Sequence, residues 1–131
     1  MNEEKLVYPE LSYKIIGVAY KIYNILGSGH KEAYYQRAFK NELTNKGIYF
    51  EREKEIRLIY ENNCIGKYIL DFIVDDKIVI EFKVFNEINN THLKQVLQYL
   101  NVVEKKLAIL IYFSKRGVIY KRIVNPKFDK K

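Results

Sequence analysis

The chain has 131 residues, of which 48% are hydrophobic and 30% are charged, and Cys64 is its single cysteine. This composition excludes a long disordered region and an internal disulfide, and no apolar run approaches the ~20 residues that a membrane-spanning helix needs. Because the first residues also lack a signal-peptide pattern, we expect one domain, 1–131, in the cytoplasm.

Two amphipathic helices are predicted in the N-terminal third. Apolar residues recur at three- and four-residue steps from Leu11 to Leu26, which predicts a helix that ends at the glycine-rich segment 27–29. A second helical pattern covers about 31–46, and Gly47 is placed as its left-handed C-terminal stop.

The rest of the chain is richer in β-branched and aromatic residues, which favour strands. The order ααβββαββ predicts one α/β domain whose first three strands form an antiparallel meander. A basic tail is expected over 124–131. The remaining predicted elements are strands at 48–60, 65–74, 78–84, 107–113 and 118–124, and a helix at 92–103 capped by Thr91.

Three charged side chains interrupt strands that are otherwise apolar on both faces, where charges are rare. Side chains alternate along 78–84, so Glu81 and Lys83 point to one face of that strand. Asp71 lies on the preceding strand. These three residues are therefore candidates for a functional role.

Whether Asp71 meets Glu81 depends on the loop between their strands. A two-residue turn at 75–76 would place the two acids on opposite faces of the sheet. A three-residue loop, 75–77, would bring their Cβ atoms within ~5 Å of each other on one face. We predict the three-residue loop.

Two carboxylates at that range repel by ~3 kcal/mol at an effective dielectric of ~20. Such a pair must be protonated, neutralised by cations or bound to a metal. Lys83 balances one charge, and Mg²⁺ binds through one or two carboxylates while it keeps several waters. The alternative is a buried ion pair between Lys83 and one acid, with the other acid exposed near a strand end.

The formal net charge of +7 favours a polyanionic partner, and nucleic acid is the commonest polyanion in the cytoplasm. Lys and Arg residues are spread along the chain, with the C-terminal third the most basic part. The alternative interpretation is a solvated basic surface that only aids solubility.

The spacing of Asp71, Glu81 and Lys83 resembles the active-site pattern of the PD-(D/E)XK nuclease superfamily, with Leu70 in place of the proline that names it. The following helix carries a Q-x₃-Y pair that resembles the extra motif of the RecB-like branch; its members are Gln95 and Tyr99.

Nearly the whole chain, about 11–124, also resembles the GxxExxY protein family. The naming motif is present as Gly29-His30-Lys31-Glu32-Ala33-Tyr34-Tyr35, with His30 and Lys31 in place of the usual apolar pair. Tyr112 and Ser114 replace the usual Asn and Gly of the strand-end motif. None of these departures removes a reactive group.

The resemblance implies a PD-(D/E)XK (restriction endonuclease-like) fold, with a central mixed sheet flanked by helices. It implies a nuclease that hydrolyses phosphodiester bonds of DNA, or of RNA, by water that Mg²⁺ or Mn²⁺ activates. Because the chain offers little surface for gripping a duplex, we also expect a homodimer. The residues implied as catalytic are Glu32, Asp71, Glu81, Lys83, Gln95 and Tyr99, and those implied as metal ligands are Asp71, Glu81, Glu32 and the carbonyl of Phe82.

Several of these residues have ordinary alternative explanations. Glu32 is also a first-turn acid favoured by the helix dipole, and Tyr99 suits buried polar packing. His92 is interpreted as a surface residue at a helix start and His30 as a loop residue. Cys64, without cysteine partners, excludes the iron-sulfur cluster of some RecB-like nucleases. The alternative function is a nuclease-fold module that binds nucleic acid without cleaving it.

Overall fold

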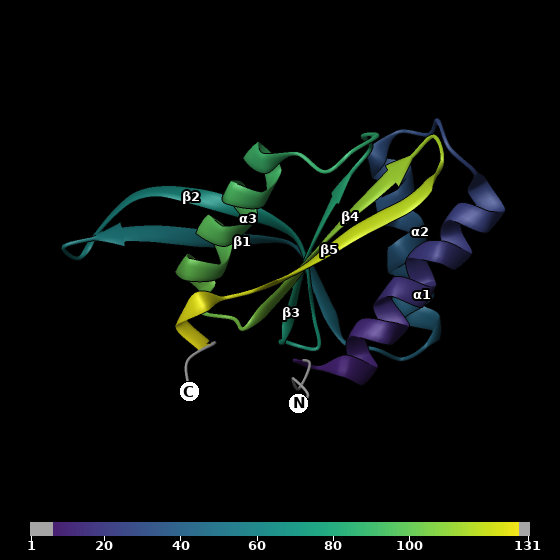
Figure 1. Cartoon of the computed structure of the whole chain (residues 1–131). Helices are drawn as coiled ribbons and strands as arrows, with labels where there is room; N and C mark the ends of the chain where they lie inside the picture. Colours follow the sequence, from purple (N-terminus) through teal and green to yellow (C-terminus); the bar gives the residue numbers. More distant parts are fainter. Residues whose placement is uncertain (1–6, 129–131) are drawn as a thin grey trace, which may run out of the picture.

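The computed structural model describes residues 7–128 and shows an α/β fold with the predicted element order (Figure 1). Every predicted helix and strand is present, and their ends are shifted by at most two residues. The helices are α1 (Pro9–Leu26), α2 (Glu32–Asn45) and α3 (Asn90–Val103). The strands are β1 (Phe50–Tyr60), β2 (Asn63–Val74), β3 (Ile78–Lys83), β4 (Leu107–Ser114) and β5 (Gly117–Val124), and a short 3-10 helix, Pro126–Phe128, follows them.

The five strands form one mixed sheet in the order β1-β2-β3-β4-β5. Neighbouring strands are antiparallel except for β3 and β4, which run parallel. A parallel pair needs a crossover connection, and α3 supplies it. The predicted meander of the first three strands is therefore confirmed. β4 is buried along its whole length, as its uninterrupted apolar sequence predicts.

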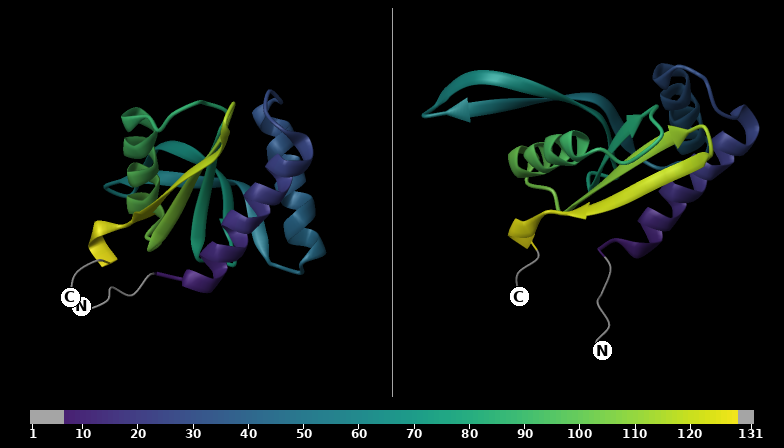
Figure 2. Two further views of the ribbon diagram at one scale, coloured as in Figure 1. Left: turned by 45° about the vertical axis from the view of Figure 1, so that its right-hand side comes forward. Right: turned by 45° about the horizontal axis from the view of Figure 1, so that its top comes forward.

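Helices cover both faces of the sheet (Figures 1 and 2). α1 and α2 pack on one face, where the rings of Phe39, Phe72 and Phe82 meet edge to face. α3 packs on the other face through residues that include Val96 and Leu100. Two separate cores therefore lie on either side of the sheet. Within residues 7–128, no helix is long and apolar enough to span a membrane.

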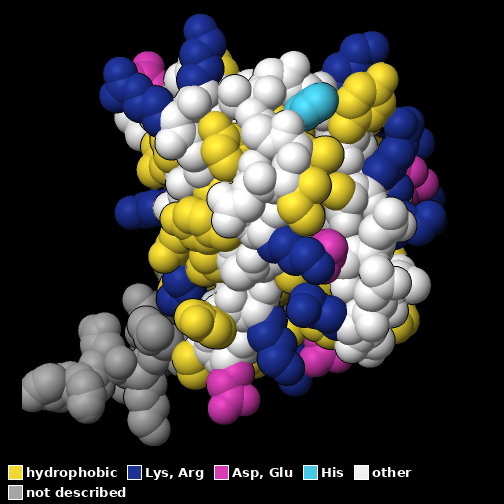
Figure 3. Space-filling model, turned by 90° about the vertical axis from the view of Figure 1, so that its right-hand side faces the viewer, with side chains coloured by type: hydrophobic (Ala, Val, Ile, Leu, Met, Phe, Trp, Pro, Cys, Tyr) yellow, Lys and Arg dark blue, Asp and Glu magenta, His cyan; other side chains and the backbone are white. Residues whose placement is uncertain are grey.

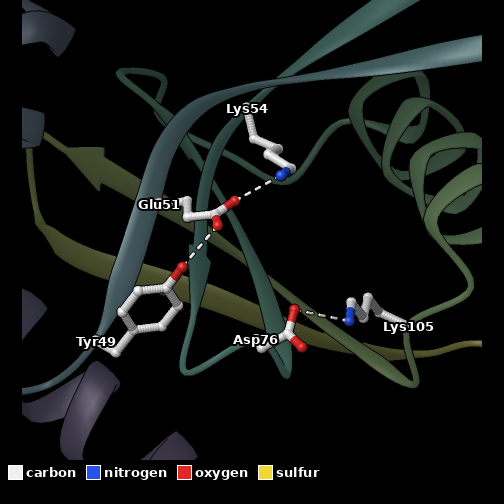
Figure 4. Close-up of polar contacts among 5 residues, drawn as sticks. All are labelled: Tyr49, Glu51, Lys54, Asp76 and Lys105. Carbon is white, nitrogen blue, oxygen red and sulfur yellow. Dashed lines mark hydrogen bonds and ion pairs between the residues drawn. The ribbon is translucent and has the colours of Figure 1, made fainter.

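The loop between β2 and β3 has the predicted odd length, so Val74 pairs with Ile78. Asp75 and Asp76 both adopt positive φ, at 54° and 57°, which Asp tolerates better than most residues. Lys105, between α3 and β4, forms an ion pair of 3.0 Å with Asp76 at the tip of the loop (Figure 4). This exposed pair contributes little free energy. The register is instead specified by burial of the apolar residues of β2 and β3.

A separate polar cluster lies at the start of β1 (Figure 4). The Tyr49 hydroxyl donates a hydrogen bond of 2.6 Å to Glu51, and Lys54 forms an ion pair of 2.7 Å with the same carboxylate. The hydrogen bond from Lys54, followed by that from Tyr49, lowers the pKa of Glu51. All three groups are solvent-accessible, so the cluster behaves as ordinary surface charge.

The predicted cap of α3 is wrong by two residues. Asn89 rather than Thr91 occupies the N-cap position, and its Oδ1 accepts a hydrogen bond of 2.7 Å from the Thr91 amide. Asn and Thr are both good capping residues, and both precede the apolar stripe of the helix. The sequence alone therefore left the start of the helix ambiguous.

Part of the segment expected as a basic tail, 124–131, belongs to regular elements: residue 124 ends β5, and the short 3-10 helix follows at 126–128. Asn125 is fully buried, and its side-chain amide donates hydrogen bonds to the carbonyls of Leu100 (3.1 Å) and Lys105 (3.0 Å). Satisfying a buried amide in this way ties the end of β5 to α3. The last part of the expected tail, 129–131, lies outside the described residues.

The β1–β2 hairpin projects beyond the rest of the sheet (Figure 2). Only Phe72, Ile73 and Val74 of β2 pair with β3, so most of the hairpin has no third strand beside it in the described part of the chain. Its two-residue turn is made by Glu61 and Asn62, both at positive φ. β2 and β3 therefore separate next to Asp71 and Glu81, the two acids predicted from the sequence.

Candidate active site

Asp71 and Glu81 face each other at the point where β2 and β3 separate. The backbone pairing between these strands ends at Phe72 and Ile80. One step further along, the Asp71 amide donates a hydrogen bond of 2.9 Å to Glu81 Oε2, and the Phe82 amide donates one of 2.8 Å to Asp71 Oδ2. The two carboxylates therefore act as the acceptors that join the diverging strands, and the predicted register is confirmed.

This acidic pair is deeply placed, and Glu81 is only 4% exposed. Burial first, and then the charge of Asp71, raise the pKa of Glu81 to about 9. Burial also raises the pKa of Asp71, although the Phe82 amide and Lys83 oppose the change. At neutral pH and without a cation, the raised pKa values mean that the pair holds a proton.

Lys83 lies two residues after Glu81 and on the same face of β3. Its positive charge lowers the pKa of Asp71, Glu81 and Glu32. Among residues 7–128, Lys83 forms no ion pair within 4.0 Å of an acid, so the buried ion pair considered as an alternative is not present. The ammonium group is therefore close enough to lower the pKa of the acids, and it has no ion-pair partner among these residues.

Glu32 approaches the same region from α2, which belongs to the α1–α2 layer. It is the first residue of α2 and is half-buried. Burial first, and then the charge of Asp71, raise the pKa of the Glu32 carboxyl. The structure thus brings together four predicted site residues from three elements: Glu32, Asp71, Glu81 and Lys83.

An irregularity in β2 explains how two helix layers meet at one site. Phe72 faces the α1–α2 core, whereas Leu70 faces the α3 core, although residues two apart on a regular strand share a face. The alternation therefore breaks at Asp71. The position opposite in β1 is Glu53, which has a positive φ of 52°, a strained conformation for a residue other than glycine. The two faces of the hairpin exchange sides at this point. The charge of Asp71 therefore acts both on Glu32, in the α1–α2 layer, and on Tyr99, on α3.

Tyr99, on α3, lies near the acidic pair on the face of the sheet opposite to α2. Burial first, and then the charges of Glu81 and Asp71, raise its pKa to about 12, so the hydroxyl stays protonated and can donate a hydrogen bond. Its ring packs against Tyr68 at 5.2 Å. Gln95 lies one helical turn earlier and is half-buried. Among the described residues, no hydrogen bond joins Gln95 to the acidic pair.

The sequence did not single out Gln36 and Arg52, which the structure places beside the site. The Gln36 amide donates a hydrogen bond of 3.0 Å to Glu32 and accepts one of 3.4 Å from Arg52. The charge of Arg52 lowers the pKa of Asp71, and its buried Nε has no partner among the described residues. The i, i+4 spacing of Glu32 and Gln36 was a usable signal. Arg52 gave none, because its role depends on tertiary packing.

His92 is more buried than the predicted surface position. Its Nδ1 lies 2.8 Å from the Tyr112 hydroxyl, and its ring packs edge-on against Phe85. Burial first, and then the charge of Lys83, lower the pKa of His92. His92 lies in the first turn of α3, as predicted, and one side of it is covered by Phe85 from the segment that follows β3. His30 lies on the loop before α2, as predicted.

The donor set fits a hard divalent cation. Asp71 and Glu81 supply carboxylate oxygens from neighbouring strands, and Glu32 is near enough to raise the local negative charge. Mg²⁺ commonly binds through one or two carboxylates and completes its shell with water. Within the described part of the chain, no group of three His, Cys, Asp or Glu side chains is close enough to hold a metal alone. Such a site therefore needs water or substrate oxygens as further ligands.

Two solved structures resemble the fold. The crystal structure of SSO0001 superimposes with a TM-score of 0.56 at 22% identity, and the match covers 91% of this chain and 58% of that one. The structure of an alkaline exonuclease, LHK-Exo, from Laribacter hongkongensis gives a TM-score of 0.43 at 14% identity, over 95% of this chain and 73% of that one. The first supports the fold alone, and the second is too distant to support an argument. No curated protein sequence matches this chain.

A family comparison covers nearly the whole chain. Residues 9–123 match the PD-(D/E)XK nuclease superfamily. This range includes every site residue from Glu32 to Tyr99. The narrower resemblance to the GxxExxY family stays a prediction. Because the match extends over far more than half of the sequence, the chain belongs to the PD-(D/E)XK nuclease superfamily.

Proposed function

We propose that this protein is a divalent-metal-dependent nuclease that hydrolyses phosphodiester bonds in DNA. The observation that carries the proposal is the hydrogen-bonded pair of Asp71 and Glu81, which lies beside an ammonium group with no ion-pair partner among the described residues. A structural role alone gives no reason to set a half-buried acid against a buried one when the pair must then hold a proton. Membership of a nuclease superfamily supports the same conclusion.

Asp71 and Glu81 would hold the cation, with Glu32 acting through a bound water and the Phe82 carbonyl as a further ligand. Bound Mg²⁺ or Mn²⁺ would supply Lewis acidity and make water a stronger nucleophile at neutral pH. Glu81 must first lose its proton, and the neighbouring Lys83 charge favours that loss.

Lys83 would neutralise the negative charge that develops on the phosphate, or orient the attacking water. A cation performs this role best when it is not already paired with an acid, and Lys83 has no such partner among the described residues. Tyr99 stays a neutral hydrogen-bond donor because of its raised pKa. Its hydroxyl and the Gln95 amide would orient water or a phosphate oxygen from the α3 side.

The charge of the molecule supports a nucleic-acid substrate. The net charge is +7, and Figure 3 shows Lys and Arg side chains scattered over one face among hydrophobic ones. Scattered cations favour contacts with a phosphate backbone over reading of base sequence. The expected homodimer and the cytoplasmic location stay predictions.

The test is cleavage of plasmid, single-stranded, branched DNA and RNA substrates, with Mn²⁺ present or chelated. Asp71→Asn keeps an acceptor for the Phe82 amide while it removes the charge, and Lys83→Met keeps the length of the side chain. Each substitution is expected to reduce the cleavage rate by about 10²-fold or more. Asp76→Asn is the matched control, because the Asp76 side chain is 80% exposed on the β2–β3 loop.

Cleavage that survives chelation, or that neither substitution reduces, would contradict the metal-dependent mechanism. Binding of nucleic acid without cleavage of any substrate would instead identify the alternative function, a nuclease-fold binding module. Cleavage of RNA but not DNA would revise the substrate class and leave the site unchanged.

A further inference from the structure

A groove lies at the carboxyl ends of the parallel strands β3 and β4, beside the proposed active site. It consists of two adjoining hollows of about 360 and 330 Å³, which share Asn86, Ser114 and Lys115 among their lining residues. The carboxyl ends of parallel strands are where α/β sheets commonly bind ligands. The size of each hollow lies within the range of small-molecule sites, about 300–1,000 Å³.

Hydrogen bonds fix the walls of this groove before any ligand binds. The Lys115 amide donates a hydrogen bond of 2.9 Å to Asn86 Oδ1, which joins the segment after β3 to the β4–β5 turn. The Tyr23 hydroxyl donates one of 2.8 Å to the carbonyl of Ser114. A preformed wall lowers the entropic cost of ligand binding.

The lining combines an aromatic ring with cationic rims. Phe85 is 42% exposed, which leaves part of a hydrophobic ring open to solvent in the first hollow. Lys115 and Arg116 line the second hollow, and in the described part of the chain neither forms an ion pair. Among the lining residues within 7–128, Glu87 is the single acid, so the cations there outnumber it two to one.

The groove adjoins the end of the strand that carries Glu81 and Lys83. Its lining includes Val84, the residue directly after Lys83 at the end of β3. The Phe85 ring meets the His92 ring edge-on at 5.4 Å between centroids, and His92 in turn feels the charge of Lys83. Because Lys83 and Phe85 are two residues apart, a nucleic-acid strand with a phosphate at Lys83 would pass close to the groove.

We propose that this groove binds an unpaired nucleotide of the nucleic-acid substrate, next to the phosphate held at the active site. The base stacks on Phe85, and Lys115 and Arg116 contact its phosphate. Stacking on an exposed aromatic ring accepts any base, and the cations add affinity that depends on salt. A base inside a duplex has no free face, so the groove favours single-stranded or branched substrates over an intact duplex. This inference rests on the proposed nuclease function and names the substrate class of that site.

The test measures binding without cleavage, using single-stranded oligonucleotides that carry 2-aminopurine, titrated in the presence of EDTA. Phe85→Leu is expected to weaken binding about fivefold or more and to reduce the fluorescence change of 2-aminopurine. Phe128→Leu is the matched control, because Phe128 is 43% exposed on the 3-10 helix, outside the groove. Phe85→Tyr keeps an aromatic face and should restore binding, which separates stacking from loss of folding.

The cationic rim is tested by salt dependence. Lys115→Gln is expected to lower the slope of log affinity against log salt by about 0.7, the value for one phosphate contact to a single strand. Lys121→Gln, an exposed substitution on β5, is the control and should leave the slope unchanged. Equal binding by the Phe85 and Phe128 variants, or a slope that Lys115→Gln does not change, would overturn the inference.

The outcomes separate this inference from the proposed function. If the wild type cleaves DNA but Phe85→Leu binds single strands normally, the groove fails and the nuclease stands. If no substrate is cleaved while Phe85→Leu still weakens binding, the groove stands and the catalytic proposal fails. The Asp71→Asn variant should lose cleavage but still bind single strands in EDTA, because Asp71 lies outside the groove.

Discussion

The backbone amide of Asp71 donates a hydrogen bond to the carboxylate of Glu81 at the place where the ladder between β2 and β3 has ended. The carboxylates of Asp71 and Glu81, which the proposed metal site requires, thus also join β2 to β3. A protonated Glu81 can satisfy this arrangement without a cation, and an ionised Glu81 needs one. The resting protein and the metal-bound protein should therefore differ in protonation as well as in occupancy.

The metal-free protein should lose stability as the pH rises from about 4.5 toward 9. The pKa of Glu81 is about 9 in the folded protein and 4.5 in its ordinary state, so the folded chain binds the extra proton between these values. Stability that is present below pH 4.5 is then lost as the pH rises toward 9, with a slope of about 1.4 kcal/mol per pH unit for one proton. Urea unfolding in EDTA from pH 5 to 9 measures this slope.

Glu81→Gln is the control for that measurement, because it mimics the protonated carboxyl. The variant should show a flatter pH profile and, at pH 8, higher stability than the wild type. An unchanged profile in the variant would show that Glu81 is not the group that titrates.

Metal binding should release a proton and strengthen with pH. Because Glu81 must ionise to become a ligand, the affinity for Mn²⁺ is expected to rise about tenfold per pH unit between pH 6 and 8. Calorimetry in buffers of different ionisation enthalpy counts the released proton directly. A pH-independent affinity with no proton release would mean that Mn²⁺ binds elsewhere.

Gln36 should act on metal binding through Glu32. Its amide donates a hydrogen bond of 3.0 Å to the Glu32 carboxylate. Gln36→Leu is expected to weaken Mn²⁺ binding by about tenfold, as is usual when the partner of a ligand is lost. Gln98→Leu, at an exposed position of α3, is the control.

A double-mutant cycle decides whether the two residues act together. In a Glu32→Gln background, Gln36→Leu should have almost no further effect on Mn²⁺ affinity, because the carboxylate that it orients is gone. Fully additive effects would show that Gln36 supports the fold rather than Glu32.

Tyr99→Phe separates a catalytic hydroxyl from aromatic packing. The substitution keeps the ring that packs against Tyr68 and removes only the donor that faces the acids. Cleavage is expected to slow by about tenfold or more while the melting temperature stays within a few degrees. Tyr68→Phe serves as the control, and equal rates for the two variants would favour the packing role.

Much of this site was predictable because its residues lie close in sequence on regular elements. The odd-length loop was predicted because, of the two loop lengths considered, it is the one that places Asp71 and Glu81 on the same face of the sheet. The start of α3 was less well determined, because Asn89 and Thr91 both suit a cap. Arg52 gave no sequence signal, since its contacts to α2 depend on how the hairpin turns over at Glu53.

The sequence by itself determined the order of the elements, the register of β2 against β3 and the chemistry of the acidic pair, because these depend on local periodicity and residue type. Only the tertiary structure decided what surrounds that pair. The break in alternation at Asp71 admits Glu32 and Gln36 from one helix layer and Tyr99 from the other. It also placed the groove of Phe85 and Lys115 at the carboxyl end of β3. Sequence motifs pointed to Glu32 and Tyr99 as candidates, but only the packing of the layers brings them to the acidic pair.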